Sequence, residues 1–295
     1  MSVPARASVE VVAVAGLCMV QDLGRPGHVH EGVPPGGALV PELLAWANEA
    51  VGNAASAAAI EVIGGISLVA GGAARVSVDG ELAKDLAAGE RIDVPRHPAR
   101  RVRYVALGGG VDVPPVLGSR STLLVAALGG HEGRALRRGD RLGTGDAGGA
   151  HAGALARALD LDLDRPIAVV AGPDLARFGD AALAALLGGV FTVSPQSDRT
   201  GTRLEGPLLP HAARAGGRSD ATRALSMPMV AGAIEVPASG APIVLGPDHP
   251  TTGGYPVIAT IVRADLGRFA ARKIGADVRF TAAAPREPGL SCPRK

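Results

Sequence analysis

The stretch Arg101-Val102-Arg103-Tyr104-Val105 alternates basic and apolar side chains, the period-two pattern of a half-buried β-strand. It belongs to a longer run, Arg101–Leu107, and the chain holds eight more runs that are rich in branched aliphatic residues and bounded by Gly, Pro, Asp or Ser. These further runs are Val9–Val14, Ile60–Val69, Arg75–Val78, Ile167–Val170, Val190–Val193, Ile243–Leu245, Val257–Val262 and Asp277–Phe280. The sequence therefore predicts a fold dominated by β-strands.

Helical patterns are fewer and short. Pro41–Val51 has apolar residues at helical spacing, with Pro41 suited to the first turn and a glycine after the last residue. The same reasoning predicts helices over Asp174–Leu187 and over Asp265–Ala271, where Asp265 is suited to cap exposed amides. The expected fold class is β-dominated α+β with a few short helices.

The length of 295 residues suggests two domains. Between Gly139 and Ala158 the composition turns to Gly and Ala, so we predict an N-terminal lobe over 1–142, a linker over 143–158, a C-terminal lobe over 159–284 and a tail over 285–295. The linker contains a G-x-G-x-x-G match at 143–148, but no buried strand precedes it, so we interpret it as a linker and not as a dinucleotide site.

The composition excludes several classes of protein. Hydrophobic residues make up 47%, which allows a sizeable core, whereas aromatic residues make up 2% and leave few rings to stack on bases. The formal net charge is +2 without a block of like charge, so nucleic acid is not an expected partner. The apolar run Val11–Val20 is too short to span a membrane. Two cysteines, Cys18 and Cys292, fit a reducing compartment, and we expect a cytoplasmic protein.

Four polar segments are candidate sites. The first follows a predicted strand and contains Gln21, Asp22 and Arg25. Asp22 could orient Arg25 by a bidentate bond, and Arg25 could then hold a carboxylate or a phosphate. The alternative is an Asp–Arg pair that only pins a tight turn. The second segment comprises two glycine-rich turns that carry Arg120 and Arg134, which suit an anion, although turn chemistry alone also explains the glycines.

The third segment is the most polar stretch of the chain, with Gln196, Asp198, Arg199 and Glu205, and its alternative is a solvated loop with surface ion pairs. The fourth follows an apolar strand, and its glycines and hydroxyl groups permit a nest of donors. Its candidate binding residues are Thr251, Thr252, Gly253, Gly254 and Tyr255. His28 and His30 have no third ligand nearby in sequence, so no metal site is predicted.

Taken in order, long motifs resemble one family, called allophanate hydrolase subunit 2. The same family is labelled biotin-dependent carboxyltransferase or KipA-like, and its stand-alone bacterial members are named as the C subunit of 5-oxoprolinase. The motifs that carry the resemblance are Val20–Gly27, Gly32–Pro35, Asn48–Asn53, Gly109–Thr122, Ser194–Arg199, Leu204–Pro207 and Thr251–Pro256.

The resemblance implies two lobes built on cyclophilin-like β-barrel modules. It implies two partners. One is the KipI-like B subunit, which belongs to the allophanate hydrolase subunit 1 family, and the other is the A subunit of the 5-oxoprolinase assembly. It also implies ATP-driven opening of a small-molecule substrate, 5-oxoproline, to glutamate, with Mg²⁺ for which no protein ligands are assigned. Asp22 or Asp198 would be the acid or base, Arg25 or Arg199 would stabilise charge, and the other candidate residues would bind substrate or nucleotide.

Three positions depart from the family's usual residues: Val40 replaces an acid, and Glu235 and Pro250 replace glutamines. These departures keep two alternatives open. One is a biotin-dependent carboxyltransferase of the urea amidolyase type, although the chain lacks a Met-Lys-Met biotinylation motif. The other is a non-catalytic regulator that binds a KipI-like partner.

Overall fold

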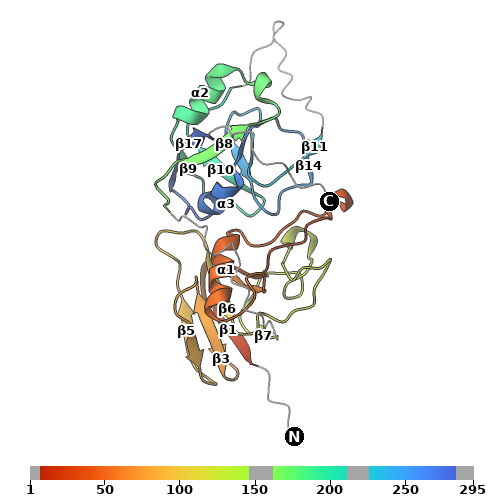
Figure 1. Cartoon of the computed structure of the whole chain (residues 1–295), viewed down its shortest axis with the longest axis vertical. Coiled ribbons are helices and arrows are strands. Elements are labelled where there is room, and N and C mark those ends of the chain that lie inside the picture. The colour runs from red at the N-terminus through yellow and green to blue at the C-terminus, as the bar shows by residue number, and fades with distance from the viewer. Residues whose placement is uncertain (1–6, 146–161, 211–225, 284–295) are drawn as a thin grey trace, which may run out of the picture.

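The computed structural model describes residues 7–145, 162–210 and 226–283, which form two lobes (Figure 1). The N-terminal lobe is red to yellow-green and the C-terminal lobe green to blue. Most of the predicted linker, and the predicted tail, lie outside the described residues. Gly143 and Thr144, which we assigned to the linker, belong to the N-terminal lobe: Gly143 ends β7 (Arg141–Gly143) and Thr144 forms a bridge with Val111.

The N-terminal sheet is organised by two long strands, β1 (Ser8–Gln21) and β2 (Ala59–Ala70), which pair antiparallel along nearly their whole lengths. The other edge of β2 pairs with β6 (Arg103–Leu107) and with β5 (Arg91–Val94). The sheet order is β4-β3-β6-β2-β1-β7, with β3 at Ala74–Val78 and β4 at Lys84–Leu86. Its core is built from aliphatic residues, in keeping with the low aromatic content of the chain.

One α-helix, α1 (Pro41–Ala50), packs on β6 and ends one residue earlier than predicted. Its buried face of Leu43, Leu44 and Ala47 joins a cluster that contains Tyr104 and, from the other lobe, Ala271. The short 3-10 helices are η1 (Val29–Glu31) and η2 (Leu124–Ala126). The core at α1 therefore reaches from one lobe to the other.

The C-terminal sheet has the order β16-β9-β10-β13-β12-β15-β8-β17. Its two outermost strands, β16 (Asp277–Val278) and β17 (Phe280–Ala282), are separated only by Arg279, so the sheet curls until its edges nearly meet. The remaining strands are β8 (Ile167–Ala171), β9 (Phe191–Val193), β10 (Gly201–Glu205), β12 (Ala233–Glu235), β13 (Ile243–Leu245) and β15 (Val257–Ile261). A separate pair, β11 (Met227–Pro228) and β14 (Thr252–Gly253), lies beside this nearly closed barrel.

Two helix predictions for this lobe were partly wrong. The run Asp174–Leu187 forms a 3-10 helix, η3 (Leu175–Arg177), and then α2 (Asp180–Gly188), because Gly179 between them has a φ of 76°. Asp265 lies inside the first turn of α3 (Arg263–Ala270) and is not its cap. Its carboxylate accepts a hydrogen bond from the Ala168 amide at 2.7 Å and pairs with Arg268 at 2.8 Å.

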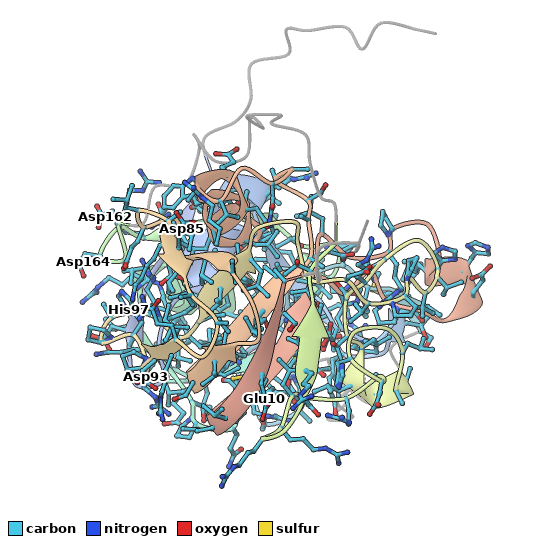
Figure 2. All side chains as sticks on the ribbon, turned by 90° about the horizontal axis from the view of Figure 1, so that it is seen from below. Glu10, Asp85, Asp93, His97, Asp162 and Asp164 are labelled. Atoms are coloured by element: carbon cyan, nitrogen blue, oxygen red, sulfur yellow. The ribbon has the colours of Figure 1, made fainter. Side chains whose placement is uncertain are left out.

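Charged side chains lie mostly on the surface. Seen from below, Glu10, Asp85 and Asp93 project from the outer face of the N-terminal lobe (Figure 2). Each pairs with an arginine that is about half exposed or more: Arg141, Arg75 and Arg91, respectively. In the described ranges, no helix is long and apolar enough to cross a membrane.

Candidate functional site at the junction of the lobes

Asp22 directly follows β1 and ties two loops together. Its Oδ1 accepts hydrogen bonds from the Gly24 amide at 2.8 Å, from Ser119 Oγ at 2.6 Å and from Ser121 Oγ at 2.5 Å. Its Oδ2 accepts from the Arg120 amide at 2.6 Å. These hydrogen bonds tie the carboxylate to Gly24 and to the glycine-rich turn 118–121, so a structural role explains why Asp22 belongs to the motif. Its predicted role as an acid or base stays a prediction.

Arg25 is enclosed, with 1% of its surface exposed. It donates to the carbonyls of Ser121 and Val116, and no bidentate pair with Asp22 forms among the contacts of the described residues. Burial lowers the pKa of Arg25, and the charges of Asp22 and Asp248 offset part of this effect. Its Nη1 has no partner within the described chain. Arg25 is thus a buried cation with an unused donor.

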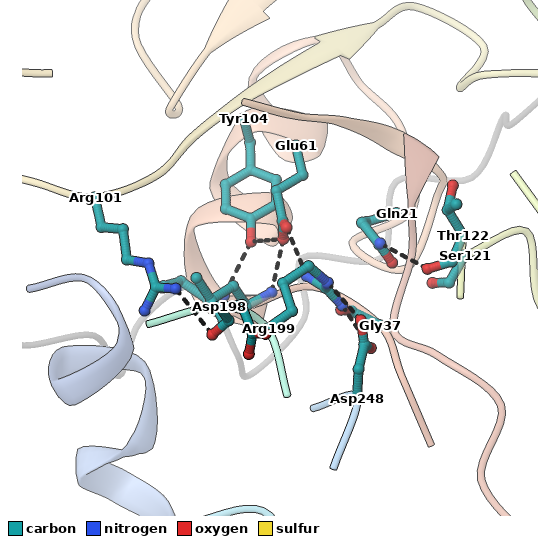
Figure 3. A network of polar contacts seen from close by, with 12 residues as sticks. Gln21, Gly37, Glu61, Arg101, Tyr104, Ser121, Thr122, Asp198, Arg199 and Asp248 are labelled. Carbon is teal, nitrogen blue, oxygen red and sulfur yellow. Dashed lines mark hydrogen bonds and ion pairs between the residues drawn. The ribbon is translucent and has the colours of Figure 1, made fainter. Parts of the chain in front are cut away.

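Gln21 is fully buried at the end of β1. Its Nε2 donates to the Thr122 carbonyl at 3.0 Å, whereas its Oε1 has no partner among the described residues (Figure 3). The nitrogen of the side-chain amide therefore holds the loop that follows Ser121.

The segment 35–39 runs between this hub and the C-terminal lobe. Its Pro35 carbonyl accepts from the Arg25 amide at 2.7 Å, and its Ala38 amide donates to the Asp22 carbonyl at 2.8 Å. On the other side, the Gly36 amide donates to the Pro247 carbonyl of the C-terminal lobe at 3.1 Å. This segment, which continues from the Gly32–Pro35 motif, is therefore a bridge between the lobes.

Arg199 is the centre of the contact between the lobes (Figure 3). Its Nη1 donates to Glu61 Oε1 at 2.5 Å, and its Nε and Nη2 donate to the two oxygens of Asp248 at 2.8 and 2.9 Å. Nη2 also donates to the Gly37 carbonyl at 2.6 Å. All three nitrogens are used, and the side chain is 4% exposed. The predicted charge stabiliser thus serves as a buried clamp between β2, the loop after β13 and segment 35–39.

The clamp extends further into the N-terminal lobe. Glu61 Oε2 accepts from the Tyr104 hydroxyl at 2.6 Å and from the Leu39 amide at 2.7 Å, and the Val40 amide donates to the same hydroxyl at 2.9 Å. Burial and the neighbouring Glu61 raise the pKa of Tyr104 well above its usual value. Sequence reasoning missed Glu61, Tyr104 and Asp248, although an acid inside the apolar run Ile60–Val69 was an available signal.

Asp198 is exposed, whereas its neighbour Arg199 is buried. Its Oδ1 accepts from the amides of Thr200 and Gly201 at 2.8 and 2.9 Å, which closes a tight turn. Its main-chain carbonyl accepts from Arg101 Nη2 at 2.9 Å, across the junction. The two residues that the sequence placed together therefore hold the junction in different ways.

The remaining candidate residues do not gather at one place. Arg134 forms a bidentate pair with Asp140 at 2.7 and 2.9 Å, and this pairing lowers the pKa of Asp140 to about 2. Arg120 is 42% exposed, and its Nε donates to the Val113 carbonyl at 2.8 Å. Gln196 is exposed, and Glu205 accepts from Ser194 Oγ at 2.6 Å.

The segment Thr251–Tyr255 includes β14, with Thr252, Gly254 and Tyr255 exposed. Within the described parts of the chain, no group of three or more His, Cys, Asp or Glu residues could hold a metal ion. The site thus combines a rigid, buried junction with an exposed turn that carries hydroxyl groups.

This fold and these motifs define a class of protein. The chain matches the carboxyltransferase domain, subdomain A and B, over residues 31–282, and it belongs to that family. It is 34% identical to the C subunit of 5-oxoprolinase from Escherichia coli (strain K12) over 276 residues, which is 88% of this chain and 86% of that protein. It is 30% identical to the 5-oxoprolinase C subunit of Haemophilus influenzae, over 95% and 92% of the two chains.

The solved structures agree with the family. The crystal structure of the K. lactis urea amidolyase matches with a TM-score of 0.83 and 25% identity, over 96% of this chain and 19% of that protein. The chain is therefore similar to one part of that larger protein, whereas it matches the two 5-oxoprolinase proteins over most of their length. The resemblance inferred from the motifs is confirmed, as is the β-dominated fold.

Proposed function

We propose that this chain is the C subunit of an ATP-hydrolysing 5-oxoprolinase, which opens 5-oxoproline to L-glutamate together with partner subunits. The observation that supports this most directly is the similarity, over nearly full length, to two proteins named as that component. The proposed partners are the KipI-like B subunit and the A subunit, and the proposed setting is the cytoplasm. The buried free thiol of Cys18 agrees with a reducing compartment.

ATP would supply a phosphoryl group that turns the unreactive lactam carbonyl into a centre that water can attack. The described residues do not fit a site for Mg²⁺ and ATP. They hold no cluster of three metal ligands, and the unused donor of Arg25 is enclosed at 1% exposure. We therefore assign ATP and Mg²⁺ to the reaction of the whole complex and derive no step through them from this chain.

The second candidate is a biotin-dependent carboxyltransferase. Its support is the family itself and the TM-score of 0.83 to the urea amidolyase. Carboxyl transfer and lactam opening both act on a planar amide-like group, so the fold alone does not separate them.

Release of glutamate from 5-oxoproline separates the candidates. The chain is mixed with its two candidate partner subunits and ATP, and each component is omitted in turn. Glutamate that forms only when this chain is present supports the proposal. A stable complex with the KipI-like partner that forms no glutamate contradicts it and favours either the carboxyltransferase or the non-catalytic regulator.

A further inference from the structure

Glu235 is a buried carboxylate that the network at the junction does not use. It is the last residue of β12, where it pairs with Ile243 of β13 and Val257 of β15. The preceding Ile234 belongs to the core of the barrel. Because successive side chains of a strand point to opposite faces, Glu235 points away from that core, toward β11 and β14.

No described residue gives this carboxylate a hydrogen bond or an ion pair, although Glu235 is only 5% exposed. A small apolar cluster that includes Met229 and Val257 lies on the same side of the sheet. Among the described residues, a few side-chain polar atoms are fully enclosed and also lack a partner, but the two oxygens of Glu235 are not fully enclosed. Each of its oxygens therefore keeps a small accessible surface. A buried polar group without a partner is costly, so such a group calls for an explanation.

The exposed turn of β14 lies directly over this carboxylate. A Cβ atom at Gly253 would lie 3.0 Å from Glu235 Oε1 and 2.7 Å from Met229 Cε, so a larger residue does not fit there without a shift. On either side of Gly253, Thr252 is exposed and Tyr255 is 51% exposed. Glycine thus leaves the carboxylate close to a surface that carries two hydroxyl groups.

Burial raises the pKa of Glu235, and no charged neighbour among the described residues offsets this effect. The strands β11, β13, β14 and β15, which pack around it, carry no ionisable residue. Arg203 on β10 lies in the same row but two strands away, and neither it nor the nearby Asp248, His249 and Tyr255 shifts this pKa. A neutral carboxyl group presents one donor and one acceptor side by side.

We propose that Glu235 binds a cis-amide, the planar group of a lactam, by donating its O–H to the lactam carbonyl and accepting from the ring N–H. The pairing satisfies all four polar groups, which neither an ionised carboxylate nor an apolar side chain does. The choice of 5-oxoproline as the lactam rests on the proposed function.

The test is the binding of 5-oxoproline to the full chain, measured by calorimetry between pH 5.5 and 8.5. The carboxylate of the ligand, with a pKa of about 3.5 as for an α-carboxyl group, does not titrate in this range. Wild-type affinity should fall with rising pH, by up to about tenfold per pH unit above the pKa of Glu235. Glu235→Gln keeps a donor and an acceptor without a titrating proton, so its affinity should stay constant across this range.

Glu235→Met removes both hydrogen bonds, and its affinity at pH 5.5 should fall by about tenfold or more. Glu81→Gln, at an exposed glutamate of the N-terminal lobe, is the matched control and should behave like wild type. Wild-type affinity that is independent of pH, wild-type binding by Glu235→Met, or no binding at any pH overturns the inference.

This test is separate from that of the proposed function. Binding that depends on pH and on Glu235, in a chain whose complex releases no glutamate, keeps the amide site and overturns the 5-oxoprolinase proposal. Glutamate release that is unchanged in Glu235→Met keeps the 5-oxoprolinase proposal and overturns the amide site.

Discussion

Replacing Arg199 by Met should weaken the junction between the lobes more than any change at a surface ion pair. The guanidinium donates two hydrogen bonds to Asp248, one to Glu61 and one to the Gly37 carbonyl. Met is apolar and nearly fills the same space, but it leaves both carboxylates buried without their cation. Glu61 is 0% exposed and Asp248 is 8% exposed, so water does not replace the lost partner.

The expected cost follows from this burial. Removing one partner of a buried ion pair destabilises a protein by about 3–5 kcal/mol. At about 2 °C per kcal/mol for a chain of this size, the midpoint of thermal unfolding should fall by roughly 6–10 °C. Loss of Arg199, which lowers the pKa of Asp248, leaves burial to raise that pKa further. The deficit should therefore be largest at alkaline pH and shrink as the pH falls and Asp248 takes up a proton.

The assay is thermal unfolding of the full chain, followed by circular dichroism at pH 8 and at pH 5. Adding Glu61→Gln and Asp248→Asn to Arg199→Met removes the stranded charges and should restore about half of the loss or more. Arg141→Met is the matched control, because Arg141 is 78% exposed and its pair with Glu10 contributes only about 0–1 kcal/mol. A midpoint that falls no further in Arg199→Met than in Arg141→Met would refute the clamp.

Three further changes test the carboxylates. Asp22→Asn offers a donor to groups that themselves donate, so the free energy of unfolding, measured by urea denaturation, should fall by about 2 kcal/mol or more. Lost turnover at unchanged stability would instead support a catalytic Asp22. Asp198→Ala removes the acceptor of two amides in a surface turn, for which we expect a loss of about 1 kcal/mol; glutamate release abolished at that modest loss would support its role as an acid or base. Burial raises the pKa of Glu42, whose Oε2 lies beside Gly267 and has no hydrogen-bond partner among the described residues. The folded chain therefore binds more protons than the unfolded chain and loses stability as the pH rises from 4.5 through the raised value. Glu42→Gln should raise the unfolding midpoint at pH 8 and not at pH 4, and an equal effect at both would contradict this assignment.

The strands with apolar runs were predictable because burial requires those residues. The strand Ile243–Leu245 was predicted with its observed bounds. By contrast, β10 lies in the polar segment for which we predicted no strand, only a candidate site or, as its alternative, a solvated loop. Thr202 and Leu204 are buried there, whereas Arg203 and Glu205 are exposed. Its short alternating pattern was present, but the density of charge on the outer face concealed it.

The clamp could not be predicted from spacing. Arg199 meets Glu61 across 138 positions and Asp248 across 49, and these contacts depend on how two separate sheets pack. Local polarity identified Arg199 and Asp22 as important residues, but it could not distinguish a residue that holds the fold from one that meets a ligand. That difference lies in the number of donors and acceptors already used within the chain.

The count of used donors limits where this chain can stabilise negative charge in the proposed reaction. Every nitrogen of Arg199 already donates, and Arg25 keeps a spare donor only inside a nearly closed space. Arg134 is held by Asp140 and Glu132. Arg120 differs, because its side chain is 42% exposed and its single ion pair, with Asp112 at 3.7 Å, is also exposed, while its main chain is fixed by Asp22. Of the predicted arginines, Arg120 is therefore the one whose guanidinium can meet an anion without breaking a bidentate pair or the contacts of the junction.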